Sequence, residues 1–200
     1  PIGIWCRSSL WAQLMSKISF LREGIRHLKT TGTIFRSGSA LCQAAINRID
    51  FDQVLTIAEL GAGDGVITNY ILNRMHADAK LIAFELSPDL CDNMRSIGDD
   101  RLIVAQDSAE ALPAWLKKLD LEQVDAIVSA IPFAALPAQV GQNILNNAHE
   151  HLRPGGLYNQ VHYSLKRLPW YQATFDTIEK QRVWANVPPA WVLYCRKGSV

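Results

Sequence analysis

A glycine-rich turn joins an apolar strand to a helix in the first half of the chain. The strand is expected at 54–60 and the helix at 66–76, and between them stand Gly61, Gly63 and Gly65. Glycine allows a tight turn and a close approach of the backbone to a ligand, because it has no Cβ. The segment therefore predicts the first strand, turn and helix of a parallel sheet, with a ligand site at the turn.

The alternation of strands and helices continues along the chain, a pattern typical of a mostly parallel sheet with helices on both faces. The predicted strands are 54–60, 80–86, 102–106, 124–129, 156–164, 179–186 and 190–196, and the predicted helices are 39–49, 66–76, 88–97, 109–119 and 138–152. Only Val187-Pro188-Pro189-Ala190 separates the last two strands, too short a link for a crossover helix, which predicts an antiparallel hairpin. The predicted fold class is α/β: a doubly wound, seven-stranded, Rossmann-like sheet that ends in this hairpin and is preceded by an N-terminal amphipathic helix.

Three junctions carry local start or stop signals. Ser39 is expected to cap the first helix, and Ser87 followed by Pro88 predicts an N-cap with proline at the first helical position. The run Arg153-Pro154-Gly155-Gly156 predicts the end of a helix and then a turn.

The composition is that of a folded protein. The chain has 200 residues, of which 48% are hydrophobic and 20% charged, and these values exclude a disordered or collagen-like chain. No run reaches the roughly 18 apolar residues of a membrane span, because Pro132 and Pro137 interrupt the best candidate at 126–140. The first thirty residues are basic and do not resemble a secretory signal. The cysteines are scattered, so we expect reduced thiols, no metal site and a cytoplasmic protein.

Charge divides the sequence into a basic arm at 1–36 and a domain at 37–200. The arm contains six Lys and Arg residues against Glu23, a net charge of +5, and because the whole chain carries +1 the domain carries −4. A basic segment of this kind favours contact with an anionic surface, either a membrane or a nucleic acid.

Apolar residues of the arm recur at spacings of three and four between 10 and 28, which predicts an amphipathic helix. Its polar side includes Lys17, Arg22 and Arg26, and Trp11 is of the residue type favoured at headgroup depth. Such a helix is suited to the interface of a membrane. An apolar stripe is also how any helix docks on a core, so packing against the domain is the alternative.

Acidic side chains lie at the ends of three successive predicted strands: Glu59, Glu85 and Asp107. Each has an ordinary alternative role, as a loop cap, a surface residue and a helix N-cap respectively. The carboxyl ends of parallel strands line one crevice, however, so we expect the three to converge. A carboxylate before the turn would repel a phosphate, and Val66 and Ile67 replace the third glycine of a dinucleotide-binding turn. A nucleoside that carries an amino acid fits better than NAD.

These residues resemble the class I S-adenosylmethionine-dependent methyltransferases. The run 59–65 is similar to the first motif of that family, and Glu85 and Asp107 match its ribose-binding and adenine-contacting acids. The resemblance implies S-adenosylmethionine as the cofactor, with these candidate binding residues: Glu59, Gly61, Gly63, Gly65, Glu85, Asp107, Ser108 and Ser129.

Within this superfamily the chain is most similar to bacterial phospholipid N-methyltransferases, which convert phosphatidylethanolamine stepwise to phosphatidylcholine. The likeness is carried by 31–39, 128–133, 155–163 and 186–190. It implies N-methylation of a phospholipid headgroup by a protein bound peripherally to the inner face of the membrane, with an anionic lipid surface rather than a nucleic acid as its partner.

The acceptor side of the site is predicted from four residues. Tyr163 lies where the lipid family carries a tyrosine and His162 is a candidate proton relay, so both are predicted catalytic residues. Neighbours on a strand face opposite ways, and the alternative is that one packs inward while the other is solvated. Phe133 is predicted to attract the methylated ammonium, and Arg36 to hold a lipid phosphate.

Two other functions stay open at this point. Ribosomal RNA adenine dimethyltransferases place N-L-P-Y after the fourth strand, whereas Ser129-Ala130-Ile131-Pro132-Phe133 keeps the proline and an aromatic residue but lacks the asparagine. A non-catalytic, membrane-associated protein with a methyltransferase fold is the other, because cofactor binding and a reactive acceptor pocket are separate properties.

Overall fold

The computed structural model describes residues 38–199. The predicted arm lies outside this range, and with it the predicted membrane or substrate residues Trp11, Lys17, Arg22, Arg26 and Arg36. The strands are β1 (Thr56–Leu60), β2 (Lys80–Phe84), β3 (Leu102–Ala105), β4 (Val124–Ser129), β5 (Leu152–His162), β6 (Thr177–Val183) and β7 (Ala190–Arg196). The α-helices are α2 (Ser39–Ile46), α3 (Val66–Leu72), α4 (Pro88–Arg95), α5 (Leu112–Lys118), α6 (Ala138–His151) and α7 (Leu168–Thr174). The 3-10 turns are η1 (Ala109–Ala111), η2 (Phe133–Ala135) and η3 (Leu165–Arg167).

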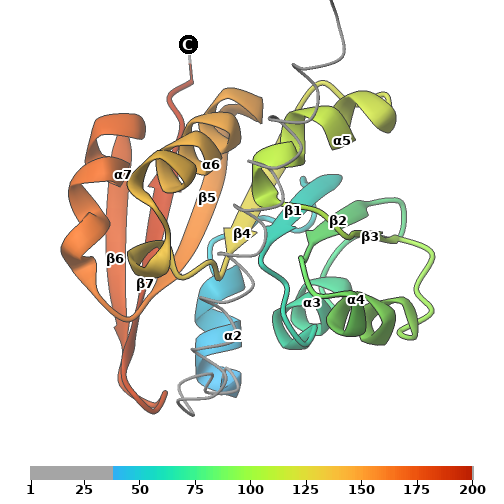
Figure 1. The fold of residues 1–200 in the computed structure, drawn as a ribbon, viewed down its shortest axis with the longest axis horizontal. Coiled ribbons are helices and arrows are strands. Elements are labelled where there is room, and N and C mark those ends of the chain that lie inside the picture. The colour runs from blue at the N-terminus through green and yellow to red at the C-terminus, as the bar shows by residue number, and fades with distance from the viewer. Residues whose placement is uncertain (1–37, 200) are drawn as a thin grey trace, which may run out of the picture. The chain divides into compact units, whose positions relative to one another are not determined.

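The described residues form one seven-stranded sheet in the order β3-β2-β1-β4-β5-β7-β6 (Figure 1). Strands β1 to β5 run parallel, and β7 pairs antiparallel with both β5 and β6. The predicted α/β sheet and its closing hairpin are therefore confirmed. The order reverses at β1, which pairs with β2 on one side and β4 on the other, and ligands bind at such a reversal in open α/β sheets.

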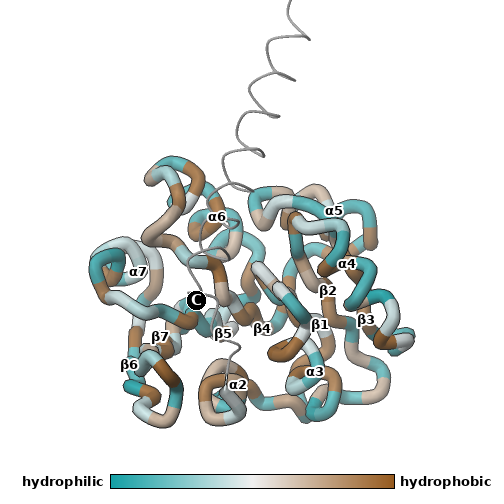
Figure 2. The backbone as a smooth tube through the Cα atoms, turned by 60° about the horizontal axis from the view of Figure 1, so that its bottom comes forward, coloured by the Kyte–Doolittle hydropathy of each residue, from teal (hydrophilic) through white to brown (hydrophobic). Residues whose placement is uncertain are grey.

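Helices cover both faces of the sheet, as Figure 2 shows with α2 and α3 on one side of the row of strands and α5 and α6 on the other. Successive strand residues point to opposite faces, so the two cores are built from alternate positions. Leu81 of β2 packs in the core that α2 and α3 cover, whereas Phe84 meets the ring of Trp115 in α5 edge-on, with ring centroids 6.2 Å apart. The central strands β1, β2 and β4 are mostly apolar because both of their faces are buried, whereas the edge strand β6 is polar and largely exposed.

Buried polar side chains fasten α2 to the sheet. Asn159 of β5 donates from Nδ2 to the carbonyl oxygens of Ala45 (2.8 Å) and Asn47 (3.1 Å), and the Tyr194 hydroxyl of β7 donates to the carbonyl of Ala44 (2.9 Å). The last carbonyls of a helix have no partner within it, so these bonds satisfy groups that burial would otherwise leave unpaired. The end of α2 is thereby held against β5 and β7.

Three local predictions need correction. Gly38, not Ser39, is the N-cap of α2, and its N–H is bound by the Asn186 side chain. Strand β5 begins at Leu152 rather than 156, because the Arg153–Gly156 run forms an irregularity in the β4–β5 pairing, with Gly155 at φ 72, instead of a free turn. Helix α7 was not predicted, since Pro169 in its first turn reads as a break in sequence although proline is well tolerated there.

The predicted start of α4 is confirmed. Ser87 is the N-cap residue of α4 and Pro88 its first helical residue. Cys42, Cys91 and Cys195 are buried as predicted. Over 38–199 no helix has the length and apolar character to cross a membrane, and no cluster of metal-ligating side chains occurs in the same range.

Candidate active site

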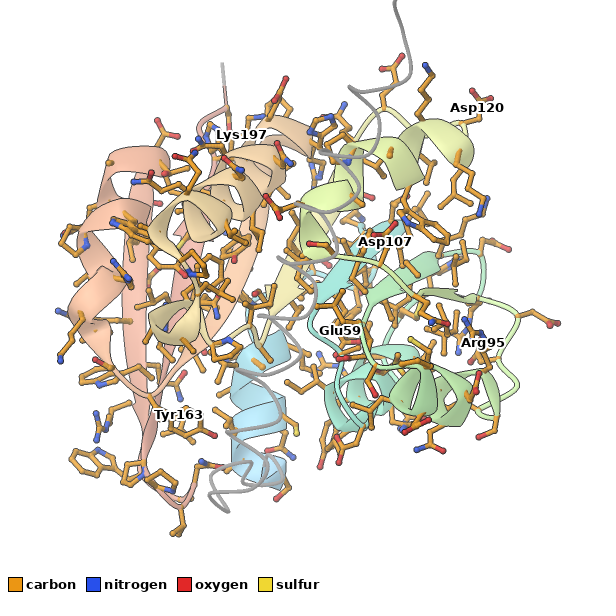
Figure 3. All side chains as sticks on the ribbon, in the orientation of Figure 1. Glu59, Arg95, Asp107, Asp120, Tyr163 and Lys197 are labelled. Carbon is orange, nitrogen blue, oxygen red and sulfur yellow. The ribbon has the colours of Figure 1, made fainter. Side chains whose placement is uncertain are left out.

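The ends of the parallel strands bring the predicted site residues to one edge of the sheet. Leu60 of β1 is level with Phe84 of β2 and with Ser129 of β4, so the residues that follow these strands lie side by side. Figure 3 labels three side chains of this edge, Glu59, Asp107 and Tyr163. The convergence of carboxylates predicted from the sequence therefore occurs.

The glycine turn lies between the end of β2 and the loop that follows β4. The N–H groups of Gly61 and Ala62 both donate to the carbonyl of Phe84 at 3.0 Å, and Gly61 has φ 76. A Cβ on Gly61 would stand 2.9 Å from Cγ1 of Ile131. Gly63, at φ 61, has no described atom within 4 Å of its missing Cβ. The turn is thus closely packed against its neighbours at Gly61, whereas the space next to Gly63 is unfilled by the described residues.

Glu59 is a buried carboxyl group. One of its oxygens accepts a hydrogen bond, and the other, which we call the bare oxygen, has no hydrogen-bond partner among the described residues. Oε2 accepts a 2.7 Å hydrogen bond from the Thr68 hydroxyl, whereas Oε1 is buried without a hydrogen-bond partner among the described residues. Burial raises the pKa of Glu59 to about 8, against the lowering effect of the Thr68 bond. A buried oxygen without a donor is costly, so this position fits a ligand that brings a donor or a positive charge.

Glu85 and Asp107 order the loops that follow β2 and β3. Glu85 Oε2 accepts from the N–H of Gly63 (3.0 Å), and Oε1 accepts from the N–H groups of Leu86 and Ser87 (both 2.8 Å). Asp107 Oδ1 accepts from the N–H of Ser108 (2.8 Å) and Oδ2 from Nε1 of Trp115 (3.2 Å). Each carboxylate is thereby oriented at the edge.

The helix-capping alternative for Asp107 is wrong. Ser108 is the N-cap of η1, and its hydroxyl oxygen accepts from the N–H of Glu110 (3.2 Å). Asp107 precedes the cap and stays exposed at the strand end.

Tyr163 and His162 face opposite sides of the sheet. This agrees with the alternative in which one of the two packs inward and the other is solvated. Tyr163 is 47% exposed and lies on the side of α2, near the Asn186 side chain. Cys42 of α2 interacts electrostatically with both Tyr163 and Glu59. Tyr163 and the Glu59 carboxyl therefore lie on the same face of the sheet, the face that α2 covers.

His162 lies in an aromatic core on the other face. Its Nε2 is 3.0 Å from the Tyr171 hydroxyl, and burial lowers the pKa of His162 to about 4. Phe133 is fully buried, with its ring centroid 5.8 Å from that of Tyr171 and 6.2 Å from that of His162. The structure places Phe133 in this core rather than on an open wall, and the relay role of His162 stays a prediction.

Two site residues were missed in the sequence. Thr68 is the fully buried partner of Glu59, and a polar residue three positions after Gly65 on an otherwise apolar helix face was the available signal. Gln160 is fully buried, donates to the carbonyl of Ile131 (3.1 Å) and accepts from the Tyr158 hydroxyl (2.7 Å). No local pattern indicates these bonds, because their partners come from other elements of the fold.

The sequence also matches a known protein family. Residues 57–156, which are half of the chain, match the family described as methyltransferase domain. The chain belongs to this methyltransferase family. The predicted resemblance to class I S-adenosylmethionine-dependent methyltransferases is therefore confirmed, and the family and the fold imply S-adenosylmethionine as the cofactor.

Relatives and solved structures show the breadth of the likeness. An ornithine lipid N-methyltransferase of Singulisphaera acidiphila is 27% identical over 184 residues, which are 88% of this methyltransferase and 94% of the relative. The crystal structure of precorrin-6y C5,15-methyltransferase from Geobacter metallireducens has a TM-score of 0.64 at 14% identity, over 82% of this chain and 95% of that one. N-methyltransferase NodS from Bradyrhizobium japonicum has a TM-score of 0.61 at 13% identity, over 72% and 86%. The two structures show the fold.

The residues present in the methyltransferase fit this cofactor. The bare Oε1 of Glu59 suits the cationic amino acid part of S-adenosylmethionine, and the open space above Gly63 admits a ligand against the backbone. Glu85 and Asp107 stand at the next two strand ends, where the ribose and the adenine would lie. When bound, the cofactor supplies an electrophilic methyl group on a sulfonium.

The raised pKa of Glu59 makes the stability of the cofactor-free methyltransferase depend on pH. The folded state holds a proton that the unfolded chain releases near a pKa of about 4.3, so this stabilisation is complete below that pH and is lost as the pH rises through about 8. Glu59→Gln has no such proton. We expect its free energy of unfolding to exceed that of the wild type increasingly from pH 5 to pH 9, reaching on the order of 2–4 kcal/mol. Urea unfolding measures this, and a difference independent of pH contradicts it.

Gly63 and Gly98 form a matched pair for testing the cofactor turn. Both have positive φ (61 and 70) and open space around the missing Cβ, so alanine costs each about 1–2 kcal/mol of stability. Only the Gly63 methyl stands over the predicted cofactor. We expect Gly63→Ala to weaken S-adenosylmethionine binding at least about tenfold and Gly98→Ala to leave it unchanged, measured by calorimetry. Equal affinities for the two variants would place the cofactor elsewhere.

Proposed function

We propose that this protein transfers methyl groups from S-adenosylmethionine to the amine of a phospholipid headgroup, from phosphatidylethanolamine towards phosphatidylcholine, at the inner surface of the membrane. The observation that carries the proposal is the relative named an ornithine lipid N-methyltransferase, matched over 94% of its length. A match of that extent includes the acceptor half of the fold as well as the cofactor turn. Ornithine lipid is therefore the second acceptor to be tested.

The chemistry of the acceptor sets what the site must do. A primary amine with a pKa near about 10.4 is mostly protonated at neutral pH, and only the neutral form attacks a methyl group. Burial raises the pKa of Tyr163, so its phenol stays protonated and orients the acceptor rather than taking a proton. The exposed ring beside α2 also offers a π face to the ammonium that forms as methyl groups are added. Proximity and desolvation then supply much of the rate.

The arm supplies the membrane contact in this proposal. Lys17, Arg22 and Arg26 would face anionic headgroups while Trp11 lies at headgroup depth, and Arg36 would bind the lipid phosphate. This part of the proposal rests on the sequence alone.

The competing functions have less support. Ribosomal RNA small subunit methyltransferase H of Nitrosospira multiformis is 33% identical, but only over 66 residues, which are 21% of that relative. A non-catalytic role has less support because residues 57–156 match the methyltransferase domain family and the relative matched over 94% of its length is named an N-methyltransferase.

A vesicle assay tests the proposal. Purified protein is incubated with methyl-labelled S-adenosylmethionine and vesicles that contain phosphatidylethanolamine or ornithine lipid, each with and without phosphatidylglycerol. We expect label in mono-, di- or trimethylated lipid and several-fold more of it on anionic vesicles, because the basic arm concentrates the enzyme there. Label in ornithine lipid alone would change the acceptor. No labelled lipid from a protein that binds the cofactor contradicts lipid methylation.

Tyr163→Phe tests the acceptor side separately from the cofactor side. The variant loses the hydroxyl that orients the acceptor in this proposal, so we expect turnover on vesicles to fall about tenfold while S-adenosylmethionine affinity stays the same. Tyr70→Phe, on the partly exposed face of α3, is the matched control and should keep full turnover. Unchanged turnover in Tyr163→Phe would remove Tyr163 from the mechanism.

A further inference from the structure

The connection between β6 and β7 shows apolar side chains to solvent. Trp184 and Val187 are each 74% exposed, and Ala185 and Pro188 are exposed beside them. The polar residue of this turn, Asn186, is the one that is buried, at 2% exposure. Surface turns normally place polar residues outward, so this arrangement is inverted. We call Trp184, Ala185, Val187 and Pro188 the hairpin surface.

Asn186 holds the hairpin surface in place. Its Oδ1 accepts from the N–H of Gly38 at 3.1 Å, its Nδ2 donates to the carbonyl of Pro188 at 2.8 Å, and the Tyr163 hydroxyl lies near the same side chain. The turn is therefore anchored to the start of α2, near the predicted acceptor residue. The exposed apolar side chains follow from a defined conformation of the turn.

The hairpin surface projects from the same edge as the active site. His162 at the end of β5 is level with Trp191, and Val183 with Ala190, so the turn continues beyond the carboxyl end of β5 (Figure 1, lower end of β6 and β7). The described residues include four large hydrophobic side chains that are exposed: Tyr163, Trp184 and Val187 at this edge, and Leu55 just before β1 at the opposite edge.

Cations accompany the hairpin surface. The Arg182 guanidinium stacks on the rings of Trp184 and Trp191, at 5.0 and 4.9 Å from their centroids, and its Nε is buried beneath them without a hydrogen-bond partner among the described residues. Lys166 and Arg167 lie in η3, directly after β5. The turn itself, 184–189, contains no acidic residue.

We propose that the hairpin surface inserts into the headgroup region of an anionic bilayer; this rests on the proposed function and adds a second membrane contact to it. Tryptophan favours headgroup depth, the apolar valine beside it can enter the acyl boundary, and the positive charge of the guanidinium that stacks on tryptophan attracts lipid phosphate. The site shows no hydrogen-bonding pattern for base edges among its exposed turn residues, which disfavours RNA. Contact at this edge turns Tyr163 and the crevice towards the lipid that carries the acceptor amine.

Vesicle sedimentation tests the hairpin surface without relying on turnover. The full chain, Trp184→Ser/Val187→Ser and the control Leu55→Ser are mixed with vesicles of equal phosphatidylcholine and phosphatidylglycerol. We expect about a tenfold weaker partition for the double variant and less than a twofold change for Leu55→Ser, because only the first two side chains enter the lipid. Equal partition of all three proteins overturns the proposal.

Fluorescence quenching supplies an independent measurement. In a Trp5→Phe/Trp11→Phe background, vesicles with brominated acyl chains should quench a fraction of the emission that disappears when Trp184→Phe is added. If no lipid is methylated but the hairpin variants lose vesicle affinity and quenching, the proposed function fails and the hairpin surface stands. If lipid is methylated and both measurements are unchanged, the hairpin surface is wrong. Loss of RNA binding or self-association with unchanged vesicle affinity also overturns it.

Discussion

The close approach of the β1 turn to the loop after β4 is the contact on which the site depends. Gly61 leaves room for Ile131, whose Cγ1 would lie 2.9 Å from a Cβ at that position. The Gln160 side chain donates a hydrogen bond to the carbonyl of Ile131. On its other side the turn is bound to the carbonyl of Phe84. Because β1 is thus fixed between β2 and β4, the open position at Gly63 and the bare oxygen of Glu59 lie in a rigid frame.

The carboxyl edge of the sheet carries two different environments. Around β1 to β3 it presents the carboxyls of Glu59, Glu85 and Asp107, and around β5 to β7 it presents cations and exposed aromatic side chains. The first suits a cofactor with a sulfonium and an amino group, and the second suits a lipid surface with phosphate groups. Tyr163, whose side chain lies near Asn186 of the hairpin, belongs to the second environment. A methyl donor and a membrane-bound acceptor would therefore meet from opposite halves of one edge.

Much of the fold and the cofactor side could be predicted because both depend on local patterns. The apolar runs, the glycine spacing and the acids at strand ends are readable from neighbours in sequence, and their convergence follows from the rule for parallel strands. The errors have a common cause. Gly38 instead of Ser39 caps α2 because Asn186, far along the chain, binds its N–H, and β5 begins early because pairing with β4 absorbs the irregularity at Gly155. Phe133 was expected to meet substrate but packs on Tyr171, which lies in a helix that the sequence did not predict.

The sequence by itself determined the order of the strands, the closing hairpin and the glycine turn with its three acids. These are properties of residue type and short spacing. Only the tertiary structure decided which oxygen of Glu59 is bare, that His162 and Tyr163 face opposite sides, and that the residues of the β6–β7 turn expose their apolar side chains while Asn186 is buried. These depend on burial and on bonds between residues distant in the chain, because a side chain's environment is set by the elements that pack around it.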